Sequence, residues 1–156
     1  MKSVLLFLLS ALALFSCNND KAPDVAVEPT DSTEVPSSVF SWQATLNDST
    51  GKMEMVKQDF TGPDSLTARG VTEFLNISHA NVQLSYLRTS NDTIYLLIPD
   101  ALFLTQQMGS TGPSMYFASA IYNYTEIPGI NYVSVDFEEG DHASPGVFTR
   151  ETFTNQ

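Results

Sequence analysis

Basic residues and cysteine are scarce in this sequence of 156 residues. It has 7 Lys and Arg against 18 Asp and Glu, so its formal net charge is −11 at pH 7. Binding to nucleic acid requires clustered Lys and Arg that neutralise phosphates, and we therefore expect no nucleic-acid partner. The single cysteine, Cys17, excludes an internal disulfide and the cysteine clusters of zinc and iron–sulfur sites. The length suits one domain of ordinary size.

Familiar catalytic signatures are also missing. The sequence has no Gly-x-Ser-x-Gly elbow, no His-Glu-x-x-His motif and no Walker loop. Its two histidines, His79 and His142, are far apart in the sequence, and a hydrolase would need them gathered with carboxylates in a pocket. The acidic run at residues 138–142 lacks the alternating spacing of an EF-hand loop and is interpreted as a solvated turn. We expect no catalytic residues, no metal site and no cofactor.

The longest apolar run lies near the N-terminus. After Lys2, residues 4–15 are apolar except for Ser10. A helix needs about 20 residues to cross a hydrocarbon core of roughly 30 Å, so this run is too short for a transmembrane helix. Its length and the preceding positive charge are typical of a secretory signal. We predict a signal peptide over residues 1–16.

The predicted signal peptide ends in a motif for lipid attachment. Leu14-Phe15-Ser16-Cys17 resembles a bacterial lipobox, in which the cysteine thiol carries a diacylglycerol, although Phe15 departs from the commonest pattern. The alternative is an ordinary secretory signal that happens to contain a cysteine. Two or three acyl chains such as palmitate hold a protein firmly on a membrane. We therefore predict a lipoprotein of the cell envelope anchored through Cys17, and Asn18 in place of Asp favours the outer membrane.

A flexible acidic tether is predicted over residues 17–37. Residues 18–37 contain three prolines, five acidic residues, one lysine and no aromatic residue. Such a composition cannot bury enough apolar surface to offset the loss of chain entropy on folding. As a coil, the segment would have a reach of roughly 25 Å. Asn-Asn-Asp-Lys at residues 18–21 resembles the surface-export signal of Bacteroidota lipoproteins.

A folded domain is predicted over residues 38–156, which hold eight of the ten Phe, all six Tyr and the single Trp. Hydrophobic periodicity predicts strands at 40–46, 52–60, 82–86, 93–98 and 131–137. Helical spacing predicts one helix over residues 65–75, capped by Asp64 or Ser65, and another from Pro113 to about residue 127. The predicted fold is α+β in the order β-β-α-β-β-α-β. It has a single antiparallel or mixed sheet of about five strands with two helices packed on it.

Two motifs frame the second predicted helix. Gly109-Ser110-Thr111-Gly112 precedes it, and Tyr-Asn-Tyr-Thr-Glu-Ile-Pro-Gly-Ile at residues 122–130 ends it before a valine-rich strand. Together with the order hairpin, helix, strand, turn and strand, these motifs resemble the GerMN (germane) domain of bacterial envelope proteins. The resemblance covers roughly residues 38–140.

The resemblance implies a modest set of properties. Family members are mostly lipoproteins or membrane-tethered proteins, and the domain is regarded as a binding or assembly module without established catalysis. It is also similar to ring-building modules of spore-envelope machinery. The family's Gly-Pro pair after its first helix is replaced here by Asn76-Ile77-Ser78, and Gly62-Pro63 stands before that helix instead.

The glycine-rich segment before the second helix is a candidate ligand contact. Free backbone N–H groups at a helix N-terminus bind anions, so Gly109, Ser110, Thr111 and Gly112 could contact one. No Lys or Arg lies nearby in the sequence, and glycines before helices are common for steric reasons alone. Both interpretations stay open.

Three hypotheses for function follow. The first is a protein-interaction module for an envelope partner, and the second is a binder of a glycan or small ligand, which an aromatic-lined cleft would favour. The third is a hydrolase. The aromatic residues Tyr116, Phe117, Tyr122 and Tyr124 are interpreted as core, with tyrosines beyond the buried face available to a partner. The oligomeric state stays open.

Overall fold

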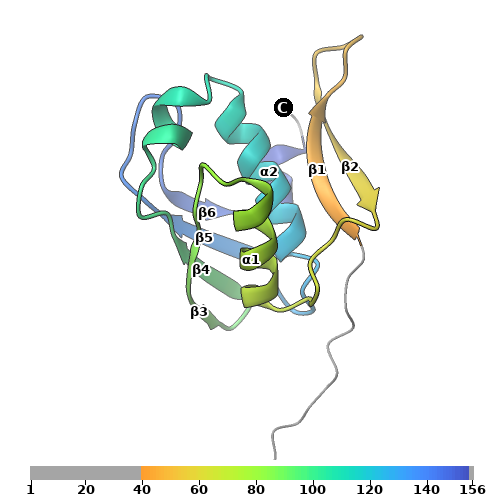
Figure 1. Ribbon diagram of the computed structural model, residues 1–156, viewed down its shortest axis with the longest axis vertical. Helices are drawn as coiled ribbons and strands as arrows, with labels where there is room; N and C mark the ends of the chain where they lie inside the picture. Colours follow the sequence, from red (N-terminus) through yellow and green to blue (C-terminus); the bar gives the residue numbers. More distant parts are fainter. Residues whose placement is uncertain (1–39, 155–156) are drawn as a thin grey trace, which may run out of the picture. The chain divides into compact units, whose positions relative to one another are not determined.

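The computed structural model describes residues 40–154 (Figure 1). Eight main elements follow one another along the chain: β1 (Phe40–Leu46), β2 (Met53–Asp59), α1 (Ala68–Ser78), β3 (Ser85–Ser90), β4 (Thr93–Leu97), α2 (Gly112–Tyr124), β5 (Tyr132–Asp136) and β6 (Gly146–Phe148). A π-helix, η1 (Phe103–Gln107), precedes α2, and a 3₁₀ helix, η2 (Arg150–Phe153), follows β6. The predicted signal peptide, Cys17 and the tether lie outside the described residues. Between residues 40 and 154, no helix has the length and hydropathy to cross a membrane.

The larger sheet has the strand order β3-β4-β5-β6 and is mixed. β4 and β5 are parallel, whereas β3 with β4 and β5 with β6 are antiparallel. A parallel pair requires a crossover, and the chain through η1 and α2 supplies it. The nearly continuous hydrophobicity of residues 93–98 predicts a central strand, and β4 is central. The predicted α+β class is therefore confirmed.

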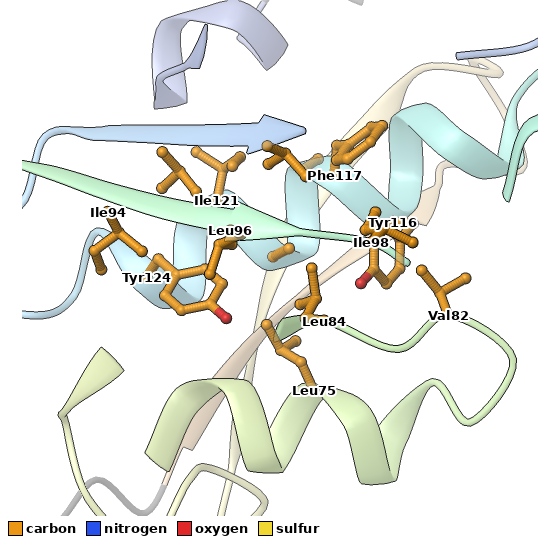
Figure 2. Close-up of a cluster of buried hydrophobic side chains, with 14 of the residues drawn as sticks. Leu75, Val82, Leu84, Ile94, Leu96, Ile98, Tyr116, Phe117, Ile121 and Tyr124 are labelled. Carbon is orange, nitrogen blue, oxygen red and sulfur yellow. The ribbon is translucent and has the colours of Figure 1, made fainter. Parts of the chain in front are cut away.

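Both main helices lie on one face of this sheet (Figure 1). Figure 2 shows apolar side chains of α1, β4 and α2 gathered between them, including Leu75, Ile94, Leu96, Ile121 and Tyr124. Each of these side chains is at most 1% exposed. Full burial of an aliphatic side chain of this size contributes about 1.5–3 kcal/mol, so this cluster holds the helices on the sheet.

The single predicted sheet is wrong, because β1 and β2 form a separate two-stranded sheet. The hairpin itself is as predicted. Its strands are antiparallel, and the turn between them is closed by the Asn47 side chain, which accepts hydrogen bonds from the N–H groups of Ser49 and Thr50. Gly51 has a φ of +67°, which glycine adopts without strain. The hairpin packs on α2 instead of extending the larger sheet.

Four further details differ from the prediction. β3 spans Ser85–Ser90 instead of the predicted 82–86, because the backbone of Leu84 bonds to the side chain of Asn76 and not to a strand. α1 begins at Ala68, because the hydroxyl oxygen of Thr67 accepts the hydrogen bond from the Gly70 N–H group, and Ser65 only supports the Thr67 hydroxyl. The sheet gains β6, which at three residues is too short to show alternation. The segment before α2 contains η1, which has no apolar pattern long enough to predict a helix.

Candidate functional site

The site begins where the outer edge of β1 meets α2. In α2, nine of the thirteen residues are buried, including the polar Ser119 and Asn123. The Ser119 hydroxyl oxygen accepts a hydrogen bond from the Ala44 N–H group at 2.9 Å. The Asn123 side chain accepts one from the Trp42 N–H group at 3.0 Å and donates one to the Trp42 carbonyl at 2.8 Å. Asn123 thus pairs with β1 in the way that a neighbouring strand would.

The spacing of these contacts follows from backbone geometry. Residues four apart in a helix lie about 6.0 Å apart along its axis, and residues two apart in a strand are separated by about 6.6 Å. Ser119 and Asn123 are four residues apart in α2, and they bind the N–H groups of Ala44 and Trp42. These two N–H groups are two residues apart on the edge of β1 that points away from β2. The two spacings match closely enough for one helix face to cover two successive outward N–H groups. Edge strands that are covered in this way do not pair with other chains.

Glu126 joins three elements beside this edge. Its carboxylate accepts a hydrogen bond from the Trp42 indole N–H group at 2.9 Å and forms an ion pair with Arg150. Arg150 also donates hydrogen bonds to the Thr125 hydroxyl and the Tyr122 carbonyl, and its guanidinium lies 4.8 Å from the centre of the Tyr122 ring. Glu126 belongs to the motif at residues 122–130, so that motif holds β1, α2 and η2 together.

A cleft of about 320 Å³ lies beside this junction. The hairpin forms one of its walls through Ser41, Trp42 and Gln43 of β1, Gln58 of β2 and Thr61 just beyond β2. Ser41 is buried, and its hydroxyl lies within hydrogen-bonding distance of the Thr61 hydroxyl, at 3.2 Å. The hairpin wall therefore presents amide and hydroxyl groups. Because side chains alternate along a strand, the indole ring of Trp42 lies on the opposite face of β1, against Tyr122 and Glu126.

The opposite wall comes from α1 and the residue that caps its C-terminus. Phe74, Leu75, Ser78 and His79 line this wall, and Ser119 and Asn123 of α2 complete the lining. These residues and those of the hairpin wall define what we call the hairpin cleft. Two of its side chains are aromatic, namely those of Phe74 and His79, and none of the residues that line it is Asp, Glu, Lys or Arg.

His79 is the titratable residue of this lining. Burial lowers the pKa of its imidazole below the usual value of 6.5, so the ring is mostly uncharged at pH 7. Its ring meets the ring of Tyr116 edge-on, with the centroids 5.2 Å apart. Burial raises the pKa of the Tyr116 hydroxyl far above its usual range, and this hydroxyl has no hydrogen-bond partner in the described part of the chain. At neutral pH the hairpin cleft is thus lined by uncharged groups.

The predicted anion contact lies elsewhere, before α2. Gly109, Ser110 and Thr111 are exposed, and Thr111 makes no side-chain cap to the helix. Gly109 has a φ of +68°, and a Cβ on Gly112 would lie 2.6 Å from the Cβ of Met108. Backbone conformation and packing therefore account for both glycines. Anion binding by this segment stays a prediction.

The residues considered for hydrolysis or metal binding are not brought together. His142 is exposed on the loop between β5 and β6, whereas His79 lines the hairpin cleft at the end of α1. In the acidic run at 138–142, Glu139 accepts a hydrogen bond from the Ser144 hydroxyl. Within residues 40–154, no group of three or more His, Cys, Asp or Glu side chains is placed to hold a metal ion.

The aromatic residues of α2 are divided between the core and the junction with the hairpin. Tyr116, Phe117 and Tyr124 are buried, and the Tyr124 hydroxyl forms a 2.7 Å hydrogen bond with the Thr72 hydroxyl of α1. Tyr122 is partly exposed and packs edge-on against Trp42. Three of the four residues are therefore core, and Tyr122 belongs to the junction with the hairpin.

Comparisons with known proteins give a structural likeness. No protein-family model matches the sequence, and no curated protein matches it. The structure is similar to a solved structure of the tandem GerMN domains of the sporulation protein GerM from Bacillus subtilis, with 14% sequence identity and a TM-score of 0.43. The likeness covers 68% of this chain and 40% of that chain, so this chain matches less than half of the length of that structure.

Proposed function

We propose that this protein is a lipid-anchored component of a bacterial cell envelope and that its domain is a non-catalytic, GerMN-like binding module. The N-terminal lipid would hold the protein on the membrane, and the acidic tether would separate the domain from the lipid surface. The domain would then bind another component of the envelope. The composition of the hairpin cleft is the observation that carries the binding role.

The anchor is supported by Leu14-Phe15-Ser16-Cys17 after the apolar run of residues 4–15. Cys17 is the single cysteine of the sequence and stands where a lipobox requires it. Growth with an alkyne fatty acid should label the wild-type protein. Cys17→Ser should abolish the label and release the protein from the membrane fraction, because the variant has no thiol to carry the acyl chains that stable binding needs. Equal labelling and membrane retention of both proteins would contradict the anchor.

The binding role is supported by the concave shape and lining of the hairpin cleft. Ligand sites are concave, commonly about 300–1,000 Å³, and combine apolar or aromatic surfaces with a few polar groups. The hairpin cleft has that volume and that mixture. The resemblance of residues 109–130 to the GerMN domain also favours a binding or assembly role over catalysis.

Photo-crosslinking in native cells tests this function. A photoreactive amino acid at Gln43, which is exposed at the cleft, should give a recurrent adduct with an envelope component. The same amino acid at Gln106, an exposed residue of η1, is the matched control and should give only background products. Background products from both positions would contradict the proposal.

The nature of the bound component separates two versions of this function. A protein adduct from Gln43 would favour an assembly module. The alternative is a binder of a glycan or small ligand, and the aromatic side chains of Phe74 and His79 favour it.

A further inference from the structure

We infer that the hairpin cleft binds an uncharged saccharide, with its polar side chains contacting sugar hydroxyl groups and its aromatic rings contacting the apolar faces of the sugar ring. This inference rests on the proposed binding function and names the class of ligand. Three properties of the cleft support it: the absence of charge in the lining, the supply of unpaired polar side chains, and the aromatic surfaces beside them.

The absence of charged residues in the lining disfavours charged ligands. The protein has a formal net charge of −11, yet none of the residues that line the hairpin cleft is Asp, Glu, Lys or Arg. The His79 imidazole is mostly uncharged at pH 7, because burial lowers its pKa. A cationic or anionic ligand would lose hydration here without gaining a counter-charge, which is costly. An uncharged ligand does not incur this cost.

The polar side chains of the cleft fall into two groups. The side chains of Ser119 and Asn123 already form hydrogen bonds within the protein. Besides their bonds to β1, Ser119 donates to the Met115 carbonyl and Asn123 donates to the Ser119 carbonyl. By contrast, the amides of Gln43 and Gln58 have no hydrogen-bond partner within residues 40–154. The first group shapes the cleft, and the second remains available to a ligand.

The available groups match the chemistry of a sugar. Each amide of Gln43 and Gln58 both donates and accepts hydrogen bonds, as does an uncharged imidazole. The Ser78 hydroxyl and the His79 imidazole also lack a hydrogen-bond partner within the described residues. A hydroxyl group likewise donates one hydrogen bond and accepts others, so a polyhydroxylated ligand can pair with these groups in several orientations.

Aromatic side chains lie on the wall that α1 forms. Phe74 belongs to α1 and His79 caps its C-terminus, and both are partly exposed. Sugar rings carry C–H groups on their faces, which pack against aromatic rings while the hydroxyl groups reach polar side chains. The cleft places aromatic rings and free amides within one hollow of about 320 Å³.

The experiment uses the full-length protein and its single tryptophan, Trp42, which lies between Ser41 and Gln43 in the hairpin wall. Trp42 fluorescence is followed during titration with three uncharged tetrasaccharides: cellotetraose, maltotetraose and chitotetraose. We expect a saturable change with at least one of them, with half-saturation on the order of 1 mM because the cleft is open. Trigalacturonic acid tests a charged sugar, and an acetylated, amidated Ser-Gly tetrapeptide tests an uncharged peptide. Both should bind at least tenfold more weakly than the best tetrasaccharide.

Variants locate the binding. Gln58→Ala and Ser78→Ala each remove one available polar group and should weaken saccharide binding about 3- to 10-fold, the effect of one hydrogen bond. Gln106→Ala removes an exposed glutamine of η1 and should leave the affinity unchanged. Thermal unfolding of each variant verifies that it is folded. Unchanged affinity in both cleft variants would place the binding elsewhere and overturn the inference.

The inference also fails if no tetrasaccharide gives a saturable change, or if the peptide or the charged sugar binds as well as the best tetrasaccharide. These results are distinguishable from failure of the proposed function. If saccharides do not bind but photo-crosslinking at Gln43 captures an envelope protein, the binding function stands and the saccharide assignment is wrong. If neither experiment gives binding, both are wrong.

Discussion

α2 has two junctions that are built differently. Toward the larger sheet it presents apolar side chains such as Phe117 and Ile121, which belong to the core that also contains Val133 and Val135 of β5. Toward β1 it presents Ser119 and Asn123, which bind backbone groups of the strand. One junction depends on apolar burial and the other on directed hydrogen bonds.

The difference explains how one helix supports both a core and a cleft. Apolar burial has no direction and is strong when it is complete, so it suits a closed layer. Hydrogen bonds have fixed geometry, and those from Ser119 and Asn123 set the position of β1 on the helix. The hairpin is therefore held at one edge while its other side lines an open cleft. The following predictions test this contrast.

The largest effect is expected in the core. Leu96 of β4 is 1% exposed, and Leu96→Ala should lower the free energy of unfolding by about 2–5 kcal/mol, because the substitution removes buried methyl groups and leaves a cavity. Urea denaturation measures the change. Leu102→Ala is the matched control, since Leu102 is 52% exposed and should change the stability by less than about 0.5 kcal/mol. Equal losses in both variants would contradict the position of the core.

The polar junction should contribute less. Asn123→Ala removes three hydrogen bonds, two of them to Trp42, and should lower the free energy of unfolding by about 1–3 kcal/mol. The hairpin should loosen before the sheet, so Trp42 fluorescence should change at lower urea concentration than far-ultraviolet circular dichroism. Asn81→Ala, at an exposed asparagine, should leave the two transitions coincident. Coincident transitions in Asn123→Ala would show that the hairpin and the sheet unfold together.

A smaller effect is expected at the ion pair of Glu126 and Arg150, whose side chains are 25% and 34% exposed. Glu126→Gln removes the charge but keeps an oxygen that can accept the hydrogen bond from the Trp42 indole. The expected loss is at most about 1 kcal/mol, and it should shrink as salt screens the pair. Urea midpoints at low and high salt measure it, with Glu73→Gln on the exposed face of α1 as the control. A loss that does not depend on salt would contradict an electrostatic origin.

The smallest effect concerns pH. Burial lowers the pKa of His79 below 6.5, so the unfolded chain binds a proton more readily than the folded chain. The resulting loss of stability should develop as the pH falls through 6.5 and level off below the pKa of the folded state. His79→Gln should remove this part of the pH dependence, whereas His142→Gln, at the exposed histidine, should retain it. Thermal midpoints between pH 7.5 and pH 5 provide the measurement. If the thermal midpoints of wild type and His79→Gln changed with pH in the same way, titration of His79 would not be the cause of this pH dependence.

Local patterns in the sequence predict β4, β5 and both helices well, whereas β3 is displaced from the predicted residues 82–86 and β6 is not predicted. The apolar run of β4 indicates a central strand, and the Pro113 and Pro128-Gly129 signals bracket α2. These features depend on residues that are close together in the chain. The leader and the lipid anchor at Cys17 are likewise local patterns, and they stay predictions because they lie outside the described residues.

The separate hairpin could not be predicted by the same means. Alternation in residues 40–46 indicates a strand but not its neighbour, and here the neighbour of one edge is a helix. A signal was nevertheless present, because Ser119 and Asn123 are polar residues four apart within a mostly apolar helix. Such a pair indicates a polar partner against that face. The hairpin cleft depends on this junction, and it unites residues as distant in the sequence as Gln43 and Ser78.

Hydrogen exchange under native conditions tests the two-junction account most directly. The amides of Trp42 and Ala44, which are bound by side chains of α2, should exchange through a local opening of the hairpin. The free energy of that opening should be at least about 1 kcal/mol lower than the value for the amides of Ile94 and Leu96 in β4. Equal values for both pairs, close to the free energy of global unfolding, would show one cooperative unit and contradict the account.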